Sequence, residues 1–144
     1  VDYAHSPDAV ARALDAVTPA SGGRRIVVLG CGGDRDRDKR RLMGEIAAHG
    51  CDLLIVTDDN PRSEDPAVIR AAMLEGAQQG SGPRGEIREI GDRRDAIAGA
   101  IAEARPGDVV LVLGKGHEQG QDISGVIHPF DDREELRRAL AGAS

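Results

Sequence analysis

Short apolar runs rich in Ile, Val and Leu alternate along this chain with longer segments in which apolar residues recur at helical spacing. The short runs predict strands and the longer segments predict helices. Such alternation is typical of βαβ units, in which consecutive strands lie parallel. We therefore predict an α/β fold with a Rossmann-like, mostly parallel sheet, helices on both of its faces and an antiparallel edge hairpin. The predicted strands are 24–30, 51–57, 85–91 and 108–114, and the predicted helices between them are 39–50, 66–79 and 93–105.

The two ends of the chain differ from this middle part. Residues 1–5 predict one more strand, and Ser6-Pro7 predicts the start of a helix, because serine caps helices and proline suits their first position. Near the other end, 122–130 predicts a short hairpin that turns on Ser124-Gly125. The final segment, 131–143, has helical spacing with acids at its start, which suits the helix dipole.

The composition narrows the classes of function. A chain of 144 residues with 40% hydrophobic content can bury the core of one domain. The net charge of −6 has the wrong sign for binding a phosphate backbone, and Tyr3 and Phe130 are the only aromatic residues available for stacking on bases. We therefore expect no nucleic-acid partner. No charged-then-apolar leader and no long apolar run occurs, so we expect neither export nor a membrane partner. The valine at position 1 suggests a fragment of a longer protein.

The cysteines indicate a reducing compartment. Cys31 and Cys51 form no CxxC pair and no Cys/His cluster, which argues against a disulfide framework or a zinc site. Cys31 is a conceivable nucleophile, but no paired histidine can be assigned to it, so we expect a small buried residue instead. A cytoplasmic location fits these features.

Lysine is rare in this sequence. Only two of the 19 basic residues are lysines, and both Lys39 and Lys115 fall in glycine-rich, motif-like stretches. One interpretation is chance in an arginine-biased chain. The other is that an ammonium group is needed at those two places.

The loop after the first predicted strand, GCGGDRDRDKR at 30–40, combines glycines with charge. Ligands of open parallel sheets bind at the carboxyl ends of the strands, where this loop lies. Its glycines permit a tight turn or an anion near the next helix. The loop is neither GxGxxG nor a Walker A sequence, so the chain lacks the usual phosphate cradle. A glycine turn before a solvated helix is the structural alternative.

The loop after the second predicted strand, TDDNPRSEDP at 57–66, carries Asn60 and Arg62 on either side of a proline. Proline favours extended geometry before it, and in an extended segment side chains two residues apart point the same way. This spacing predicts a rigid fork of an amide and a guanidinium, suited to a carboxylate. Alternatively, Arg62 pairs with Asp58, Asp59 or Glu64 in a surface network.

The loop after the last predicted strand contains GKGHE at 114–118. Its two glycines allow a close approach of the backbone, and Glu118 places a carboxylate where an ammonium could be met. Because Arg62 is expected at the same edge of the sheet, we predict one cleft for a ligand that carries both charges. From spacing alone, Asp2, Tyr3 and His5 are polar groups at a strand end.

Taken together, VDYAHSPDA, GCGGDRDRDKRRLMG, TDDNPRSEDP, GKGHE and HPFDDREE match, in order and spacing, the sequence blocks of one family. The chain resembles the C-terminal domain of the Mur ligases, and specifically of the MurE group, the UDP-N-acetylmuramoyl-tripeptide synthetases of peptidoglycan assembly. The resemblance covers the chain nearly from end to end. It implies that residues 1–144 are an amino-acid-binding C-terminal domain, with the UDP-binding and ATP-binding domains outside this chain.

The resemblance implies an ATP-dependent amide ligase. In the family, ATP phosphorylates the carboxylate of UDP-MurNAc-L-Ala-D-Glu, and the amine of meso-diaminopimelate attacks the acyl phosphate. ATP and Mg²⁺ are held mainly by the central domain, so this domain is expected to supply no catalytic or metal-binding residue and to be inactive alone. A monomer is expected.

The family's site residues carry over to matching positions of this sequence. Lysine lacks the distal carboxylate of diaminopimelate, so a site that leaves Arg62 unpaired should reject lysine by on the order of a thousandfold. Two departures from the family pattern are Arg41, where many relatives have proline, and Gly120, where many have an aromatic residue. The implied diaminopimelate site is Arg35, Asp59, Asn60, Pro61, Arg62, Gly114 and Glu118, and the implied nucleotide-contacting block is Asp2, Tyr3 and His5.

Two other readings remain open at this point. One is a lysine-adding or folylpolyglutamate-type ligase of the same fold, against which the DNPR sequence at 59–62 speaks. The other is a non-catalytic α/β module that binds a nucleotide or an amino acid.

Overall fold

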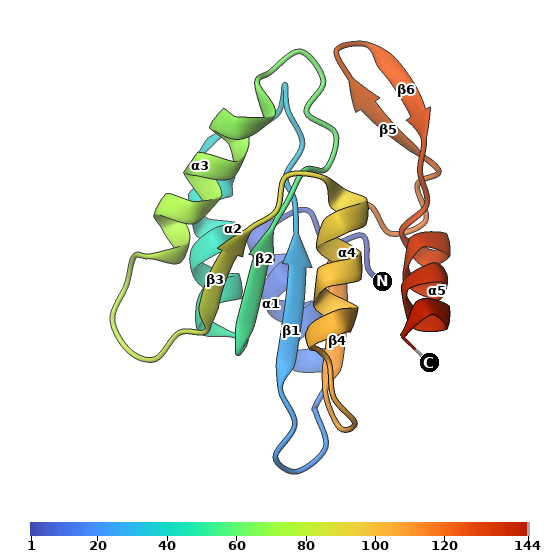
Figure 1. The fold of residues 1–144 in the computed structure, drawn as a ribbon. Helices are drawn as coiled ribbons and strands as arrows, with labels where there is room; N and C mark the ends of the chain where they lie inside the picture. Colours follow the sequence, from blue (N-terminus) through green and yellow to red (C-terminus); the bar gives the residue numbers. More distant parts are fainter. Residues whose placement is uncertain (144) are drawn as a thin grey trace.

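A four-stranded parallel sheet forms the centre of the computed structural model, which describes residues 1–143 (Figure 1). The strand order is β3-β2-β1-β4. The chain builds the sheet outward from β1 to β3 and then crosses back to add β4 on the other side of β1, so the point where the strand order reverses lies between β1 and β4. The strands are β1 (Arg25–Leu29), β2 (Leu53–Val56), β3 (Glu86–Glu89) and β4 (Val109–Leu113), and the helices are α1 (Pro7–Ala16), α2 (Asp38–His49), α3 (Pro66–Ala77), α4 (Arg93–Glu103) and α5 (Asp132–Gly142).

Both faces of the sheet are covered, as predicted. Alternate residues of β1 point to opposite faces, so Val27 and Leu29 join one core while Ile26 and Val28 join the other. The first core packs under α1, α2 and α3, and the second packs under α4 with help from α5. Strands buried on both faces explain the continuous apolar runs of the sequence. The predicted α/β class with a parallel sheet is confirmed.

The predicted first strand is not formed. Residues 1–5 make only an isolated parallel bridge, in which Asp2 N donates to Val112 O and Gly114 N donates to Asp2 O. The helix that follows begins as expected, because Ser6 Oγ accepts from Ala9 N at 3.2 Å and Pro7 opens α1. One residue of pairing is enough to place the first segment beside the end of β4.

The predicted hairpin is formed by β5 (Gly120–Ile123) and β6 (Val126–Pro129), with Ser124 and Gly125 at its turn. It makes its own two-stranded antiparallel sheet and does not extend the central one. Figure 1 shows it standing beyond the carboxyl ends of the central strands, above α5. An isolated bridge between Ile123 and Arg62 is one of its links to the rest of the domain. The hairpin therefore attaches to the loop that follows β2.

No helix within residues 1–143 has the length and apolar character needed to cross a membrane.

Candidate functional site

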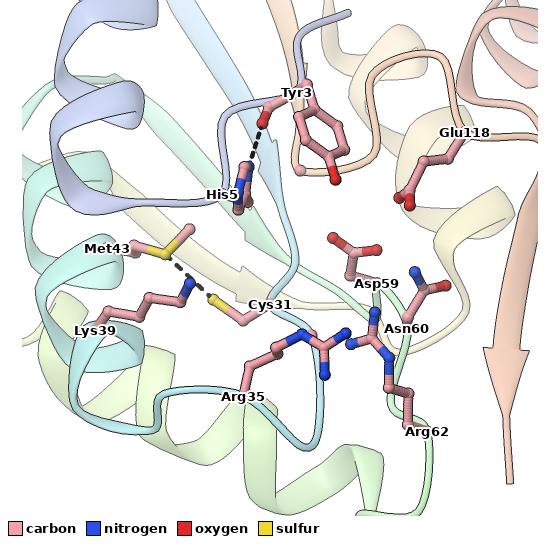
Figure 2. A pocket seen from close by; sticks show the side chains of 12 residues that line it. Tyr3, His5, Cys31, Arg35, Lys39, Met43, Asp59, Asn60, Arg62 and Glu118 are labelled. Carbon is pink, nitrogen blue, oxygen red and sulfur yellow. Dashed lines mark hydrogen bonds between the residues drawn. The ribbon is translucent and has the colours of Figure 1, made fainter. Parts of the chain in front are cut away.

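A cavity of about 150 Å³ lies at the carboxyl ends of β1, β2 and β4 (Figure 2). Loops from both sides of the point where the strand order reverses contribute to it, which is where ligands bind in open α/β sheets. Larger hollows occur elsewhere on the surface, but this one gathers residues from all of the motif loops. The lining residues are Tyr3, His5, Cys31, Gly32, Arg35, Lys39, Met43, Asp59, Asn60, Arg62, Gly114 and Glu118.

Arg62 has an unusual backbone. Its φ of 53° lies in the left-handed region, which costs a non-glycine residue about 1 kcal/mol or more. The hairpin holds it there, because Arg62 N donates to Asp122 O at 2.9 Å and Arg62 O accepts from Ser124 N at 2.8 Å. The prediction of an extended segment is therefore wrong at Arg62, because the hydrogen bonds to the hairpin hold this residue in the left-handed region.

The guanidinium of Arg62 is only partly used by the protein. Its Nη1 donates to Gly33 O at 2.8 Å, and no carboxylate within residues 1–143 forms an ion pair with it. The alternative prediction, in which Arg62 pairs with Asp58, Asp59 or Glu64, is therefore wrong. Figure 2 shows Arg62 and Arg35 on the same side of the cavity, opposite Glu118.

The neighbouring acids have other partners. Asp58 forms an ion pair with Arg70, and desolvation by burial raises the pKa of its carboxyl. Glu64 accepts from Arg40 Nη2 at 2.6 Å and from the backbone N of Asp34, also at 2.6 Å. The hydrogen bonds from Arg40, followed by the one from Asp34 N, lower the pKa of Glu64 to about 2. The bonds of Glu64 fix the loop after β2 to the loop after β1, and Asp58 is tied to α3. Neither acid therefore pairs with Arg62.

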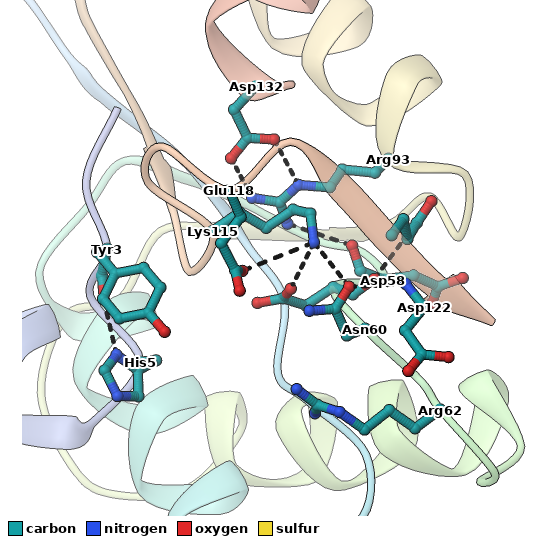
Figure 3. Close-up of polar contacts among 12 residues, drawn as sticks. Tyr3, His5, Asp58, Asn60, Arg62, Arg93, Lys115, Glu118, Asp122 and Asp132 are labelled. Atoms are coloured by element: carbon teal, nitrogen blue, oxygen red, sulfur yellow. Dashed lines mark hydrogen bonds and ion pairs between the residues drawn. The ribbon is translucent and has the colours of Figure 1, made fainter. Parts of the chain in front are cut away.

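Lys115 lies beneath the cavity and touches three of its polar side chains (Figure 3). It is 0% exposed, and its Nζ lies 3.2 Å from Asp59 Oδ1, 2.8 Å from Asn60 Oδ1 and 3.8 Å from Glu118 Oε1. The Asn60 oxygen also accepts from Asp122 N at 2.9 Å. Two donors on the same oxygen settle the orientation of this amide, whose NH₂ group has no partner within the described residues.

Glu118 is the more available of the two cavity carboxylates. Its side chain keeps 35% of its exposure, whereas the Asp59 side chain keeps 7% and is already in contact with Lys115. Arg62 and Glu118 line the same hollow, so a cationic side and an anionic side face a common space. The predicted single cleft with both charges is present.

Two glycines allow the loops to approach this closely. Gly114 has a φ of +122°, and a Cβ there would lie 2.6 Å from Asp59 Oδ2. A Cβ on Gly33 would lie 1.9 Å from Pro61 O. Larger residues at either position would push the loops after β1, β2 and β4 apart.

The first segment forms one rim of the cavity. The rings of Tyr3 and His5 lie 4.5 Å apart, and Tyr3 is 47% exposed. His5 Nδ1 is 2.8 Å from Tyr3 O, which holds the imidazole against its own loop. Both residues line the cavity, whereas Asp2 is used in the bridge to β4 and does not line it.

Cys31 is buried in the cavity wall, as expected. Its thiol is 3.6 Å from Met43 Sδ, and burial raises its pKa to about 12. A thiol of that pKa is a packing group and not a nucleophile at neutral pH.

Among the residues assigned by resemblance, Pro61 is buried and does not line the cavity. Lys39, Gly32 and Met43 line it without having been assigned. Rarity of lysine was the one sequence signal that pointed to Lys39. Its amine forms no ion pair within residues 1–143, in contrast to that of Lys115. No group of three or more His, Cys, Asp or Glu side chains in those residues could hold a metal ion.

A fully buried ion pair lies behind the cavity. Arg93 at the start of α4 donates to both carboxylate oxygens of Asp132 at 2.7 Å, and both side chains are 0% exposed. Arg93 also donates to Asp58 O and to Leu113 O at 3.2 Å. This pair fastens α5 to the carboxyl ends of β2 and β4.

Comparison with known proteins gives concordant results. The family model described as "Mur ligase, glutamate ligase domain" matches residues 1–116. A UDP-N-acetylmuramoyl-L-alanyl-D-glutamate--2,6-diaminopimelate ligase of Caulobacter vibrioides is 58% identical over 142 residues, which is 99% of this chain and 28% of that protein. This chain therefore spans a little over a quarter of that relative's length.

Solved structures agree. A UDP-N-acetylmuramoyl-L-alanyl-D-glutamate--2,6-diaminopimelate ligase superposes with a TM-score of 0.86 at 44% identity, covering 97% of this chain and 28% of that structure. A domain of a Haemophilus ducreyi ligase superposes with a TM-score of 0.57 at 14% identity, covering 99% of this chain and 89% of that structure. The second likeness shows the fold alone.

Proposed function

Because this chain belongs to the Mur ligase family, we propose that it is the C-terminal domain of an ATP-dependent ligase that adds meso-diaminopimelate to UDP-MurNAc-L-Ala-D-Glu. In this proposal residues 1–144 bind the incoming amino acid, and separate UDP-binding and ATP-binding domains complete the enzyme. The names of the relatives support the choice of acceptor. We place the enzyme in the cytoplasm as a monomer.

The observation that carries the proposal is the pair of opposite charges in one cavity. Arg62 offers a guanidinium without a carboxylate partner, and Glu118 offers a half-exposed carboxylate on the other side. The distal end of meso-diaminopimelate carries a carboxylate and an ammonium on one carbon, which is the complementary arrangement. Charge-assisted hydrogen bonds to both groups would orient the molecule.

We assign the diaminopimelate contacts to Arg35, Asn60, Arg62, Gly114 and Glu118, with Asp59 and Pro61 shaping the loop that presents them. Gripping the distal end leaves the other amine to point out of the cavity toward the acyl phosphate. Holding a nucleophile in place in this way turns a bimolecular attack into an effectively unimolecular one. The domain therefore contributes position, and no side chain here is assigned a proton transfer.

ATP, with Mg²⁺, would supply the activated phosphate of the acyl intermediate. The chain lacks a Walker A sequence, so the phosphates are assigned to the other domain. The exposed ring of Tyr3 and the adjacent imidazole of His5 form an aromatic rim that suits contact with the nucleotide. Asp2 belongs to the same segment and acts through its backbone bridge to β4.

The test is phosphate release by the full-length ligase that carries this domain, with diaminopimelate and lysine compared as acceptors. Diaminopimelate is expected to be preferred by on the order of a thousandfold in kcat/KM, because lysine leaves the guanidinium of Arg62 unpaired. Preferential use of lysine would replace the proposed acceptor. Turnover by the 144-residue chain alone would contradict the division of labour between domains.

A further inference from the structure

We propose that Lys115 is a positioning residue that sets the charge of the acceptor site and so its selection of a zwitterion. The inference rests on the proposed function and goes beyond it, since Lys115 itself does not line the cavity. Lys115 acts through the three side chains that its ammonium contacts. Figure 3 shows its Nζ among them, on the side away from Arg62.

The ammonium of Lys115 is enclosed by side-chain oxygens. Two of the three donors of its NH₃⁺ group are hydrogen-bonded to Asp59 and Asn60, and Glu118 Oε1 lies 3.8 Å away as an ion-pair partner. The side chain is 0% exposed. A ligand in the cavity does not reach a cation that is fully buried and absent from the lining, so the effect of Lys115 must be indirect.

Asp59 is the carboxylate that Lys115 contacts most closely. Its carboxylate faces the cavity, but Lys115 lies 3.2 Å from Oδ1 and neutralises it. Glu118 is then the carboxylate left to meet a ligand ammonium. The other charged lining residues, Arg35, Lys39 and Arg62, are cations, so neutralising Asp59 leaves Glu118 as the one anionic contact in a lining that otherwise favours a carboxylate.

Lys115 also orients the amide of Asn60. Lys115 and the backbone N of Asp122 both donate to Asn60 Oδ1, so the carbonyl side of the amide is turned inward. The NH₂ side is left for a ligand acceptor such as a carboxylate. Lys115 therefore fixes Asn60 so that its NH₂ group, like the guanidinium of Arg62, can donate to a ligand carboxylate.

Removal of Lys115 would leave Asp59 as an uncompensated carboxylate beside Glu118. An excess of negative charge favours an acceptor whose distal end is a bare cation over one that is a zwitterion. Removal of the Asp59 charge alone would have the opposite effect. The two changes made together would restore the balance.

The experiment compares full-length wild-type, Lys115→Met, Asp59→Asn and the double variant, with kcat/KM measured for diaminopimelate and for lysine. Lys115→Met is expected to lower the diaminopimelate-to-lysine ratio by on the order of tenfold. Asp59→Asn should raise that ratio, and the double variant should return it toward the wild-type value. If Lys115→Met does not fold, Asp59→Asn is compared with the double variant, and the ratio should again be lower without the lysine.

A purely structural role would reduce both acceptors alike and leave the ratio unchanged, which would overturn the inference. Arg24→Met is the matched control, because Arg24 pairs with Asp108 at the opposite end of the strands, far from the cavity lining. It is expected to lower the melting temperature without moving the ratio. Wild-type enzyme that fails to use diaminopimelate would instead refute the proposed function, so the two failures are distinguishable.

Discussion

Two arginines at the carboxyl edge of the sheet are used in opposite ways. Arg93 is 1% exposed and donates to both oxygens of Asp132 and to two backbone carbonyls. Arg62 donates to one carbonyl and turns the rest of its guanidinium to a cavity. The difference is in how many donors the protein itself satisfies. A saturated arginine fastens elements together, and an unsaturated one is available to a ligand.

The largest effect should come from removing Arg93, the arginine whose donors are used within the protein. Arg93→Met leaves Asp132 as an unpaired buried carboxylate, which is expected to cost about 3–5 kcal/mol in the free energy of unfolding. Urea denaturation of this chain measures the loss. Arg12→Met is the control, because the exposed pair with Asp8 contributes at most about 1 kcal/mol. A similar small effect for both variants would remove the distinction drawn here.

The unsaturated side should respond in binding and not in folding. Arg62→Ala in the full-length enzyme is expected to raise the KM for diaminopimelate about a hundredfold, because a carboxylate loses its charged partner. The free energy of unfolding should change little, because alanine and arginine at position 62 both have to adopt the same left-handed backbone. Steady-state kinetics and thermal melting measure the two quantities. An unchanged KM would exclude Arg62 from the acceptor site.

A third prediction concerns Glu64, which pairs with Arg40 and so does not pair with Arg62. The folded-state pKa of Glu64, about 2, lies below its ordinary 4.5, so its contribution to stability is present above about pH 4.5 and is lost as the pH falls toward 2. Urea unfolding between pH 6 and pH 2 should therefore be less pH-dependent for Glu64→Gln than for the unmodified chain. Parallel pH profiles for the two proteins would contradict this cause.

The smallest effect is expected at the two thiols, Cys31 in the cavity wall and Cys51 just before β2. Burial raises the pKa values of Cys31 and Cys51 to about 12, so neither thiol should react with a maleimide at pH 8 while the domain is folded. Mass spectrometry after labelling should show modification only when urea is added. Rapid labelling of Cys31 in the folded chain would mean that the wall between the two loops opens.

The sequence predicts the central fold well, because its strands are buried on both faces and its helices have clear starts. The observed β1, β2, β3 and β4 lie within the predicted ranges, and α1 begins at the predicted Ser6-Pro7. The strand predicted for residues 1–5 is wrong, because these residues form only a single bridge to Leu113. Local pattern carries no information about how many residues a neighbour will pair with.

The site was predicted less completely. Placement of Arg62 and Glu118 in one cavity follows from strand ends meeting at one edge of a parallel sheet. The left-handed backbone of Arg62 does not, since it depends on hydrogen bonds to Asp122 and Ser124, which are about sixty positions away. Rarity of lysine drew attention to Lys115, but its partners Asp59 and Asn60 are equally distant in sequence.

The attachment of the hairpin to Arg62 has a consequence for engineering. The backbone of Arg62 is held on both sides by β5, Gln121 Nε2 donates to Asp59 O, and Asp122 N donates to Asn60. The four residues 59–62 are therefore half of a structural unit whose other half lies in 120–124. Grafting DNPR alone into a ligase with a different acceptor would transfer the four residues without the contacts that hold their conformation. A chimaera therefore needs residues 59–62 and 120–124 exchanged together.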